Sequence, residues 1–343
     1  MAKIRCEFCG GNKKFDPASG RLKCEHCGSE SYISESAQLK NITRKYSLAY
    51  SPEQKVVGSR QYLCSSCGAT VSFEENDEKR RCPSCGDTSL TSQQKLIYAP
   101  DGIVPFTVSR NRAVEIFQKW IGERKFAPSD LKQMAKLGKI SGLYVPAWSF
   151  NFRIVGNFMG DCTYLEKVSD NYSVTRHQYV TEAVDKAYTS VLMSANKRFS
   201  NYSLNEVAPY DILKARPYSS EYLFGFSALD SDNNIHKVYN EIIDDKKDMI
   251  ESSIRSELKR KYDTIEKLNE NLMVRDSSFS YVYLPIWANH YTYKGKKYHC
   301  YINGQNGKPI GKSPKSFWKI LAVVLGVGAA VIIPLVLLLS KFL

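Results

Sequence analysis

The sequence of 343 residues contains no hydrophobic run long enough to cross a membrane before residue 320, and it has only five histidines. The first absence excludes a polytopic membrane protein, and an apolar fraction of 43% excludes a wholly disordered chain. No glycine-rich phosphate loop of the G-x-x-x-x-G-K-[ST] type follows a predicted strand. Since no nucleophile–base pair or open metal site stands out either, we expect a protein that is not an enzyme.

Positive charge is spread thinly along the chain. The 48 Lys and Arg against 35 Asp and Glu give a net charge of +13. Residues 1–98 carry +4, residues 99–311 carry +5, and residues 312–343 carry four lysines and no acid. A nucleic-acid-binding protein usually concentrates its positive charge in one domain or stripe. The charge balance therefore leaves nucleic acid as a partner that is not favoured.

The last part of the sequence is very apolar. Residues 320–339 form twenty consecutive uncharged residues, enough for a helix to cross a hydrocarbon core of roughly 30 Å. We expect a transmembrane helix over 320–340, the alternative being a buried helix of a soluble core. The basic juxtamembrane segment 312–319 holds three lysines against one beyond the span, and no signal peptide opens the chain. These features predict a single-pass, tail-anchored protein of the cell (inner) membrane with its bulk in the cytoplasm.

Eight of the ten cysteines form four C-x-x-C pairs, and glycine follows each pair. The pairs combine into two C-x2-C-x14-C-x2-C quartets with a constant offset of 58 residues, a spacing typical of zinc sites. A knuckle that directs two thiolates at one ion needs a positive φ just after the turn, which glycine adopts without steric cost. The predicted ligands are Cys6, Cys9, Cys24 and Cys27 in the first site, and Cys64, Cys67, Cys82 and Cys85 in the second.

Four thiolates complete a tetrahedral site and leave no position for water or substrate, so both predicted Zn²⁺ ions are structural. Disulfides and a rubredoxin-like iron site are the alternatives. His26 lies inside a knuckle, but the four cysteines already satisfy the metal, and we expect His26 to be a solvent-facing turn residue. Small ribbons of about 30 residues bury little surface, so the metal supplies folding energy.

The rest of the chain predicts an α+β multidomain protein whose body is rich in β-structure. The pattern over 110–121 indicates an amphipathic helix, and a second helix follows with Ser129 as a plausible N-cap. From Gly142 the period changes to two, which favours strands. The predicted domains are zinc ribbon 1 (1–35), a linker (36–58), zinc ribbon 2 (59–95), the α+β body (96–311), the juxtamembrane segment (312–319) and the transmembrane helix (320–340).

Two further patterns concern the body. The segment Tyr144–Trp148 is matched by Tyr283–Trp287, which suggests a duplicated β-module, with chance resemblance as the alternative. Apolar residues at helical spacing predict one long amphipathic helix over 242–272, packed on the body or, less favoured, forming a coiled coil. Cys162 and Cys300 are expected to be buried thiols.

Other motifs accompany the quartets. A Pro105-Phe106 pair precedes the helix that ends in Trp120, and the segment INGQNGKPIG (302–311) precedes the apolar end. With the Tyr144–Trp148 motif, they make the chain similar to the bacterial transcription factor IIB-type zinc ribbon-containing membrane proteins. The resemblance covers nearly the whole chain. It is greatest to the tandem-ribbon type of Bacillus, encoded beside a phage-shock-protein-A homologue and an SPFH-domain protein.

This resemblance implies an adaptor in an envelope-stress system, with the lipid bilayer, a membrane protein and SPFH-class or phage-shock-type proteins as partners. The residues agree with such a role, because closed metal sites and a single span occur without a catalytic constellation. We therefore expect a tail-anchored membrane adaptor that recruits or scaffolds protein partners. The alternative is a membrane-tethered, nucleic-acid-binding or regulatory zinc-ribbon protein. The oligomeric state does not follow from the sequence.

Overall fold

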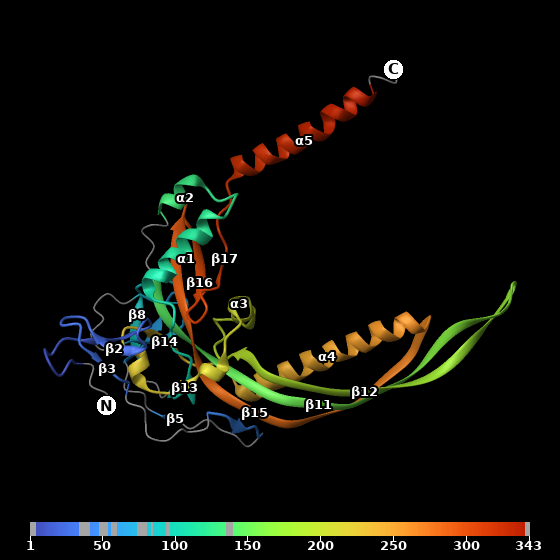
Figure 1. Ribbon diagram of the computed structural model, residues 1–343, viewed down its shortest axis with the longest axis horizontal. Coiled ribbons are helices and arrows are strands. Elements are labelled where there is room, and N and C mark those ends of the chain that lie inside the picture. The colour runs from blue at the N-terminus through green and yellow to red at the C-terminus, as the bar shows by residue number, and fades with distance from the viewer. Residues whose placement is uncertain are drawn as a thin grey trace.

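Three long antiparallel strands organise the molecule: β11 (Ile140–Ser169), β12 (Tyr172–Ser194) and β15 (Thr264–Tyr293). In the computed structural model, β11 lies between the other two, and their distal parts form an arm alongside helix α4 (Ile235–Lys261) (Figure 1). Helix α5 (Phe317–Leu339) follows the last strand of the chain and projects away from the other elements (Figure 1). The structure describes residues 5–33, 42–47, 54–55, 60–73, 81–83, 85–93, 97–134 and 140–339.

The shorter elements surround the base of these strands. The ribbon strands β1, β2 and β3 form a small sheet of their own, whereas β6, β7 and β8 continue the large sheet through β14. The remaining strands are β1 (Lys13–Asp16), β2 (Arg21–Cys24), β3 (Glu30–Ser31), β4 (Arg44–Lys45), β5 (Gln54–Lys55), β6 (Arg60–Cys64), β7 (Thr70–Phe73), β8 (Leu90–Gln93), β9 (Ile97–Tyr98), β10 (Gly102–Ile103), β13 (Arg216–Pro217), β14 (Ser227–Leu229), β16 (Lys296–Asn303) and β17 (Pro309–Gly311). The remaining helices are α1 (Arg110–Gly122), α2 (Ser129–Met134), α3 (Asn201–Val207), and the 3-10 turns η2 (Ile212–Lys214) and η3 (Ser220–Leu223).

The two matching sequence motifs lie on adjacent strands and pair with each other. Tyr144 faces Pro285 and Pro146 faces Tyr283 across the β11–β15 ladder. The two copies of the internal repeat therefore pair with each other inside the large sheet. They do not form two separate β-modules in the described residues. The two faces of this strand pair are buried in different clusters, with Tyr144 and Tyr283 in one and Val145 and Leu284 in the other.

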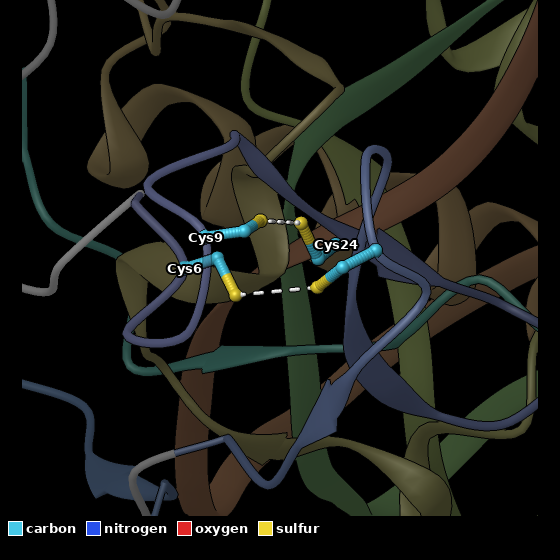
Figure 2. A group of neighbouring side chains, drawn as sticks. Cys6, Cys9 and Cys24 are labelled. Atoms are coloured by element: carbon cyan, nitrogen blue, oxygen red, sulfur yellow. Dashed lines mark hydrogen bonds between the residues drawn. The ribbon is translucent and has the colours of Figure 1, made fainter.

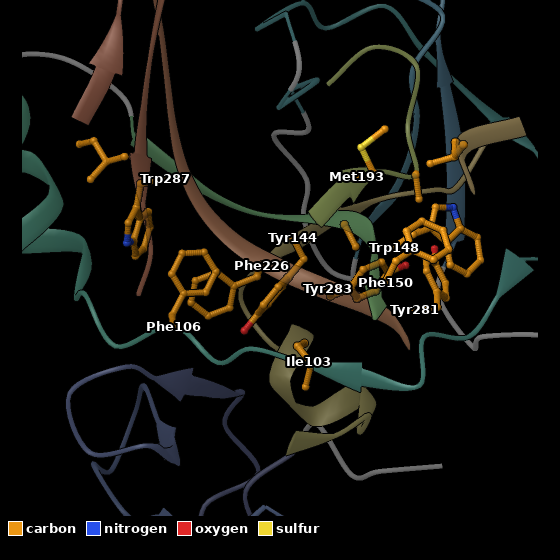
Figure 3. Packing of buried hydrophobic residues seen from close by; sticks show 14 of the residues in the cluster. Ile103, Phe106, Tyr144, Trp148, Phe150, Met193, Phe226, Tyr281, Tyr283 and Trp287 are labelled. Carbon is orange, nitrogen blue, oxygen red and sulfur yellow. The ribbon is translucent and has the colours of Figure 1, made fainter. Parts of the chain in front are cut away.

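An aromatic core covers one face of this central pair. Phe106 stacks on Phe226 with ring centroids 4.4 Å apart, and Trp148 packs on Tyr281 at 4.6 Å (Figure 3). Each such ring buries about 150–250 Å² of surface, so a few of them account for much of the apolar burial that stabilises the body.

Helix α1 confirms the amphipathic helix predicted over 110–121. Ser109 caps it by accepting a hydrogen bond from the backbone N–H of Arg112, and the buried side chains of Phe117 and Trp120 join the aromatic core. Helix α2 also forms, with Ser129 as its first helical residue. The strands predicted from Gly142 onward are present as β11 and β12.

The long helix predicted over 242–272 is wrong in its last third. Helix α4 ends at Lys261, Tyr262 adopts an extended conformation, and β15 begins at Thr264. Ile265 and Leu268, which continue the helical spacing, instead lie opposite Cys162 and Gly160 of β11. Pairing with a strand a hundred residues away overrides the local pattern, because helix propensity is a weak preference that tertiary contacts readily outweigh.

Helix α5 occupies most of the segment predicted to span a membrane. Within the part of the chain that the structure describes, no helix combines the length and the apolar character that membrane crossing requires. Residues 340–343 and the side chains of 329, 331 and 333–339 lie outside the described residues. The described side chains at the start of α5, among them Phe317 and Trp318, are exposed.

Candidate metal centres

The first quartet of cysteines comes together between the first knuckle and the β1–β2 hairpin. The Sγ atoms of Cys6 and Cys27 lie 3.7 Å apart, and those of Cys9 and Cys24 lie 3.5 Å apart (Figure 2). All four Sγ atoms lie within 4.8 Å of one another. Residues from two segments, about fifteen positions apart in sequence, therefore converge on one point.

The second quartet repeats this arrangement. Cys64 Sγ lies 3.6 Å from Cys85 Sγ, and Cys67 Sγ lies 3.6 Å from Cys82 Sγ. In both groups the first cysteine is close to the fourth and the second is close to the third. The constant 58-residue offset in the sequence thus corresponds to the same local geometry in space.

All four knuckles share one backbone pattern. In the first, the N–H of Gly10 donates to the carbonyl of Cys6 at 2.9 Å, and the N–H of Cys6 donates to the carbonyl of Gly11 at 2.7 Å. The glycines that follow the four C-x-x-C pairs have φ between +62° and +78°. This confirms the prediction that glycine is needed there, because other residues seldom adopt a positive φ. These glycines are Gly10, Gly28, Gly68 and Gly86.

The separations between the sulfur atoms fit a tetrahedral metal. Four thiolates at about 2.3 Å from a zinc ion place neighbouring sulfurs about 3.8 Å apart, close to the 3.5–3.7 Å of the two clusters. None of the ten cysteines forms a disulfide, so the disulfide alternative is not observed. Each cluster can therefore hold one metal ion, and a full set of four sulfur ligands leaves no coordination position for a substrate.

The environment of the first cluster includes a residue that the sequence reasoning did not single out. The hydroxyl of Ser29 lies 3.1 Å from the Sγ atoms of both Cys6 and Cys27. Hydrogen bonding by Ser29 lowers the pKa of Cys6 to about 6, against the effect of burial, and also lowers the pKa of Cys27. This favours the thiolate form of these two cysteines, the form in which cysteine binds a metal. His26 is exposed and lies outside the quartet, as predicted.

The position equivalent to Ser29 in the second cluster is Asp87. Its carboxylate accepts a hydrogen bond from the backbone N–H of Ser89 at 2.9 Å, which holds the pKa of Asp87 below its usual range. Lys297 on β16 lies 3.8 Å from the same side chain. The sequence contains a signal for both residues. A polar residue directly follows the second C-x-x-C-G of each quartet, at a position where its side chain can lie beside the cysteines.

The two clusters are attached to the body in different ways. Cys64 and Cys82 are fully buried and belong to a hydrophobic cluster with Val71 of β7 and Leu229 of β14. Strand β7 pairs with β14, and His290 Nε2 donates to the carbonyl of Pro83 at 2.6 Å. Burial lowers the pKa of His290, so the neutral ring is favoured. The second ribbon is therefore part of the large sheet and its core.

The first ribbon instead docks through one hairpin. Phe15 of β1 packs edge-on against Tyr222 at 5.2 Å between ring centroids, and its backbone N–H donates to the carbonyl of Phe224. Within the described residues, β1–β3 form no ladder with the large sheet. Cys9 and Cys27 are exposed, whereas Cys67 and Cys85 of the second cluster are half-buried. The first metal centre thus lies nearer the surface.

The chain is similar to one protein of Bacillus subtilis (strain 168), the uncharacterized protein YdjG. The two are 24% identical over 338 residues, which cover 98% of this chain and 96% of that protein. No protein family matches the chain, and no solved structure matches it. The similarity therefore extends over the whole length without showing the family or the function.

Proposed function

We propose that this protein is a membrane-attached adaptor in which two structural zinc ions stabilise a cytoplasmic, β-rich body that binds other proteins. The observation that carries the proposal is helix α5, most of whose described apolar side chains are exposed. Val324 and Leu325, for example, are 60% and 63% exposed. Water-exposed apolar surface on this scale is costly and marks a site for a membrane or a partner.

The charge next to α5 supports the membrane as the partner of this helix. Lys312, Lys315 and Lys319 lie before the apolar segment, and Trp318 stands beside them at the start of the helix. Lysines on the cytoplasmic side and tryptophan at the interface are the usual flanks of a membrane-spanning helix. The uncharged run of twenty residues supplies the length.

An adaptor role is supported by the metal centres. Each cluster supplies four sulfur ligands, so a bound zinc ion has no open position at which to activate water or bind a substrate. The metal then stabilises a surface instead of performing chemistry. The resemblance noted from the sequence suggests membrane, SPFH-class or phage-shock-type proteins as the partners, in an envelope-stress system.

Deleting residues 320–343 is expected to move the protein from the membrane fraction to the soluble fraction. The double variant Val327→Lys/Ile332→Lys should do the same, because each charge near the centre of a membrane helix costs about 2.5–3.5 kcal/mol. Flotation of membranes from cells expressing each variant, followed by alkaline extraction, measures the distribution. Leu213→Lys is the matched control, since Leu213 is 93% exposed but lies on η2, and this variant should remain in the membrane fraction.

The adaptor part of the proposal has a separate readout. A fluorescently labelled SPFH-class partner should concentrate at the membrane in cells that express the full chain and stay diffuse in cells that express the shortened chain. Membrane retention of the shortened chain would contradict the anchor. A partner distribution that is independent of this protein would contradict the adaptor role.

A further inference from the structure

Strand β12 has a free edge along the arm. Within the described residues it pairs only with β11, and the ladder from Phe152–Tyr188 to Lys167–Ser173 contains no bulge. The strand lacks proline between residues 172 and 194. Natural proteins usually protect such edges with proline, bulges or a covering element, because unpaired backbone groups bind another strand readily.

Exposed apolar side chains accompany this edge. Tyr179 is 59% exposed at the middle of β12, and Tyr172 is 61% exposed at its start. Leu165 and Val168 are exposed on the neighbouring stretch of β11. The arm thus presents apolar surface next to unpaired backbone, a combination found where a strand is added to a sheet.

We propose that the free edge of β12 pairs with β12 of a second copy of this chain, forming a two-fold symmetric dimer with one continuous sheet across both arms. In the proposed register Tyr179 faces Tyr179 of the second copy. Residues 172–186 of the two strands then overlap. The proposal concerns the assembly of the chain and depends on neither the metal nor the membrane anchor.

Symmetry restricts the possible registers. A two-fold axis perpendicular to the sheet keeps each side chain on its own face, and directly opposed residues of an antiparallel pair share a face. The numbers of two facing residues must therefore both be odd or both be even. Arg176 and Glu182 satisfy this condition, and they face each other twice in the register centred on Tyr179.

The paired side chains are compatible with this contact. Arg176 donates from its Nε to Glu166 of β11 at 2.6 Å. Among the described residues the side chain of Glu182 forms no hydrogen bond, although its charge contributes to the raised pKa of Lys261 on α4. Each dimer gains two Arg–Glu contacts and one tyrosine pair, the kinds of cross-strand pair that stabilise sheets.

Alternative registers of β12 are less favourable. Centring the pair on Thr181 places Arg176 opposite Lys186, which is repulsive. Centring it on Val184 pairs Glu182 with Lys186, but the second strand must then also pair with the stretch around Ser190. Ser190 has φ +52° and lies beside the register shift at Phe150 and Phe152, so the edge is irregular there. The register centred on Tyr179 ends before that point.

The free edge of distal β15 does not offer the same match. Register shifts in its ladder with β11 fall at residues 265–267 and 275–278. Between them, the acid Glu270 stands at an even-numbered position and the bases Lys267 and Arg275 at odd-numbered positions, so opposite charges lie on opposite faces. No two-fold symmetric pairing of this stretch with itself can therefore place an acid directly opposite a base. Charge complementarity thus favours β12 as the dimer edge.

Cysteine cross-linking of the full chain in detergent tests the register. Tyr179→Cys is expected to form a disulfide with itself across the axis, because facing Cβ atoms lie about 4.5–5.5 Å apart. His177→Cys alone should not, since two copies of residue 177 are about 13 Å apart along the strands. A mixture of His177→Cys and Thr181→Cys should cross-link, because residue 177 faces residue 181.

Charge exchange provides a second test that does not depend on introduced cysteines. Arg176→Glu is expected to raise the dimer dissociation constant about tenfold, and the double variant Arg176→Glu/Glu182→Arg should restore it. Light scattering of the full chain in detergent measures the constant. Glu270→Arg on β15 is the matched control and should have no effect.

Three results would overturn the proposal. The first is a full chain that is monomeric at about 100 µM, a concentration far above the dissociation constants of specific complexes. The second is equal cross-linking of the residue 177 and residue 179 variants. The third is a dimer that is insensitive to Arg176→Glu. The unmodified chain measures any cross-linking by the native cysteines. We expect little, because Cys162 and Cys300 are fully buried and the other eight cysteines belong to the two clusters.

Discussion

A chain with Cys82→Ser is expected to hold one zinc ion instead of two and to unfold about 10 °C below the unmodified protein. Cys82 is fully buried in the hydrophobic cluster that joins the second ribbon to β14. Losing the metal there frees β6, β7 and β8 from a sheet that they share with the body. The free energy of metal binding is also free energy of folding, and a net loss of about 3–5 kcal/mol gives a shift of this size in a domain of about 150–250 residues.

Cys24→Ser is the matched comparison. It should also reduce the metal content from two ions to one, because it removes one ligand of the first cluster and leaves the second quartet intact. The effect on thermal unfolding should be smaller, since β1–β3 form a separate sheet. Metal analysis and thermal unfolding of both variants measure the two effects.

Two outcomes would contradict this assignment. Two zinc ions per chain in either variant would show that the substituted cysteine is not a ligand. Equal destabilisation by the two substitutions would show that the ribbons are attached to the body in equivalent ways. The same metal analysis separates zinc from iron, because an iron centre with four thiolates would be detected as iron.

Gly156→Ala is expected to destabilise the arm by about 2–4 kcal/mol. Gly156 has φ +144°, and a Cβ added there would lie 2.0 Å from the backbone oxygen of Asn271 on β15. The obstacle is backbone, so β11 and β15 must separate to accommodate a methyl group. The conformational cost of a non-glycine residue at this φ adds to the steric one.

Amide hydrogen exchange measures where this destabilisation occurs. Exchange should accelerate in the arm portions of β11 and β15, while the strands around the aromatic core keep their protection. Gly122→Ala is the control, because an added Cβ meets no atom within 4 Å at the end of α1, and its effect should be within about 0.5 kcal/mol. Unchanged exchange in Gly156→Ala would mean that the two strands do not approach closely at this point.

Local patterns predicted the parts of the structure that depend on neighbouring residues. The helical spacing of Phe117 and Ile121 was sufficient for α1, because amphipathic packing acts within a few turns. Alternation after Gly142 was sufficient for β11. The same reasoning failed for Ile265 and Leu268, whose helical spacing is local but whose partners lie on a distant strand.

The sequence by itself determined the two metal-ligand sets. A C-x-x-C-G knuckle is a local structure, and its cysteine spacing and positive-φ glycine are sufficient to specify it. Only the tertiary structure decided that the second ribbon joins the large sheet while the first forms a separate sheet that packs on the body core through Phe15, that Tyr144 pairs with Pro285, and that β12 keeps a free edge. These features depend on contacts between residues far apart in the chain, which no local pattern encodes.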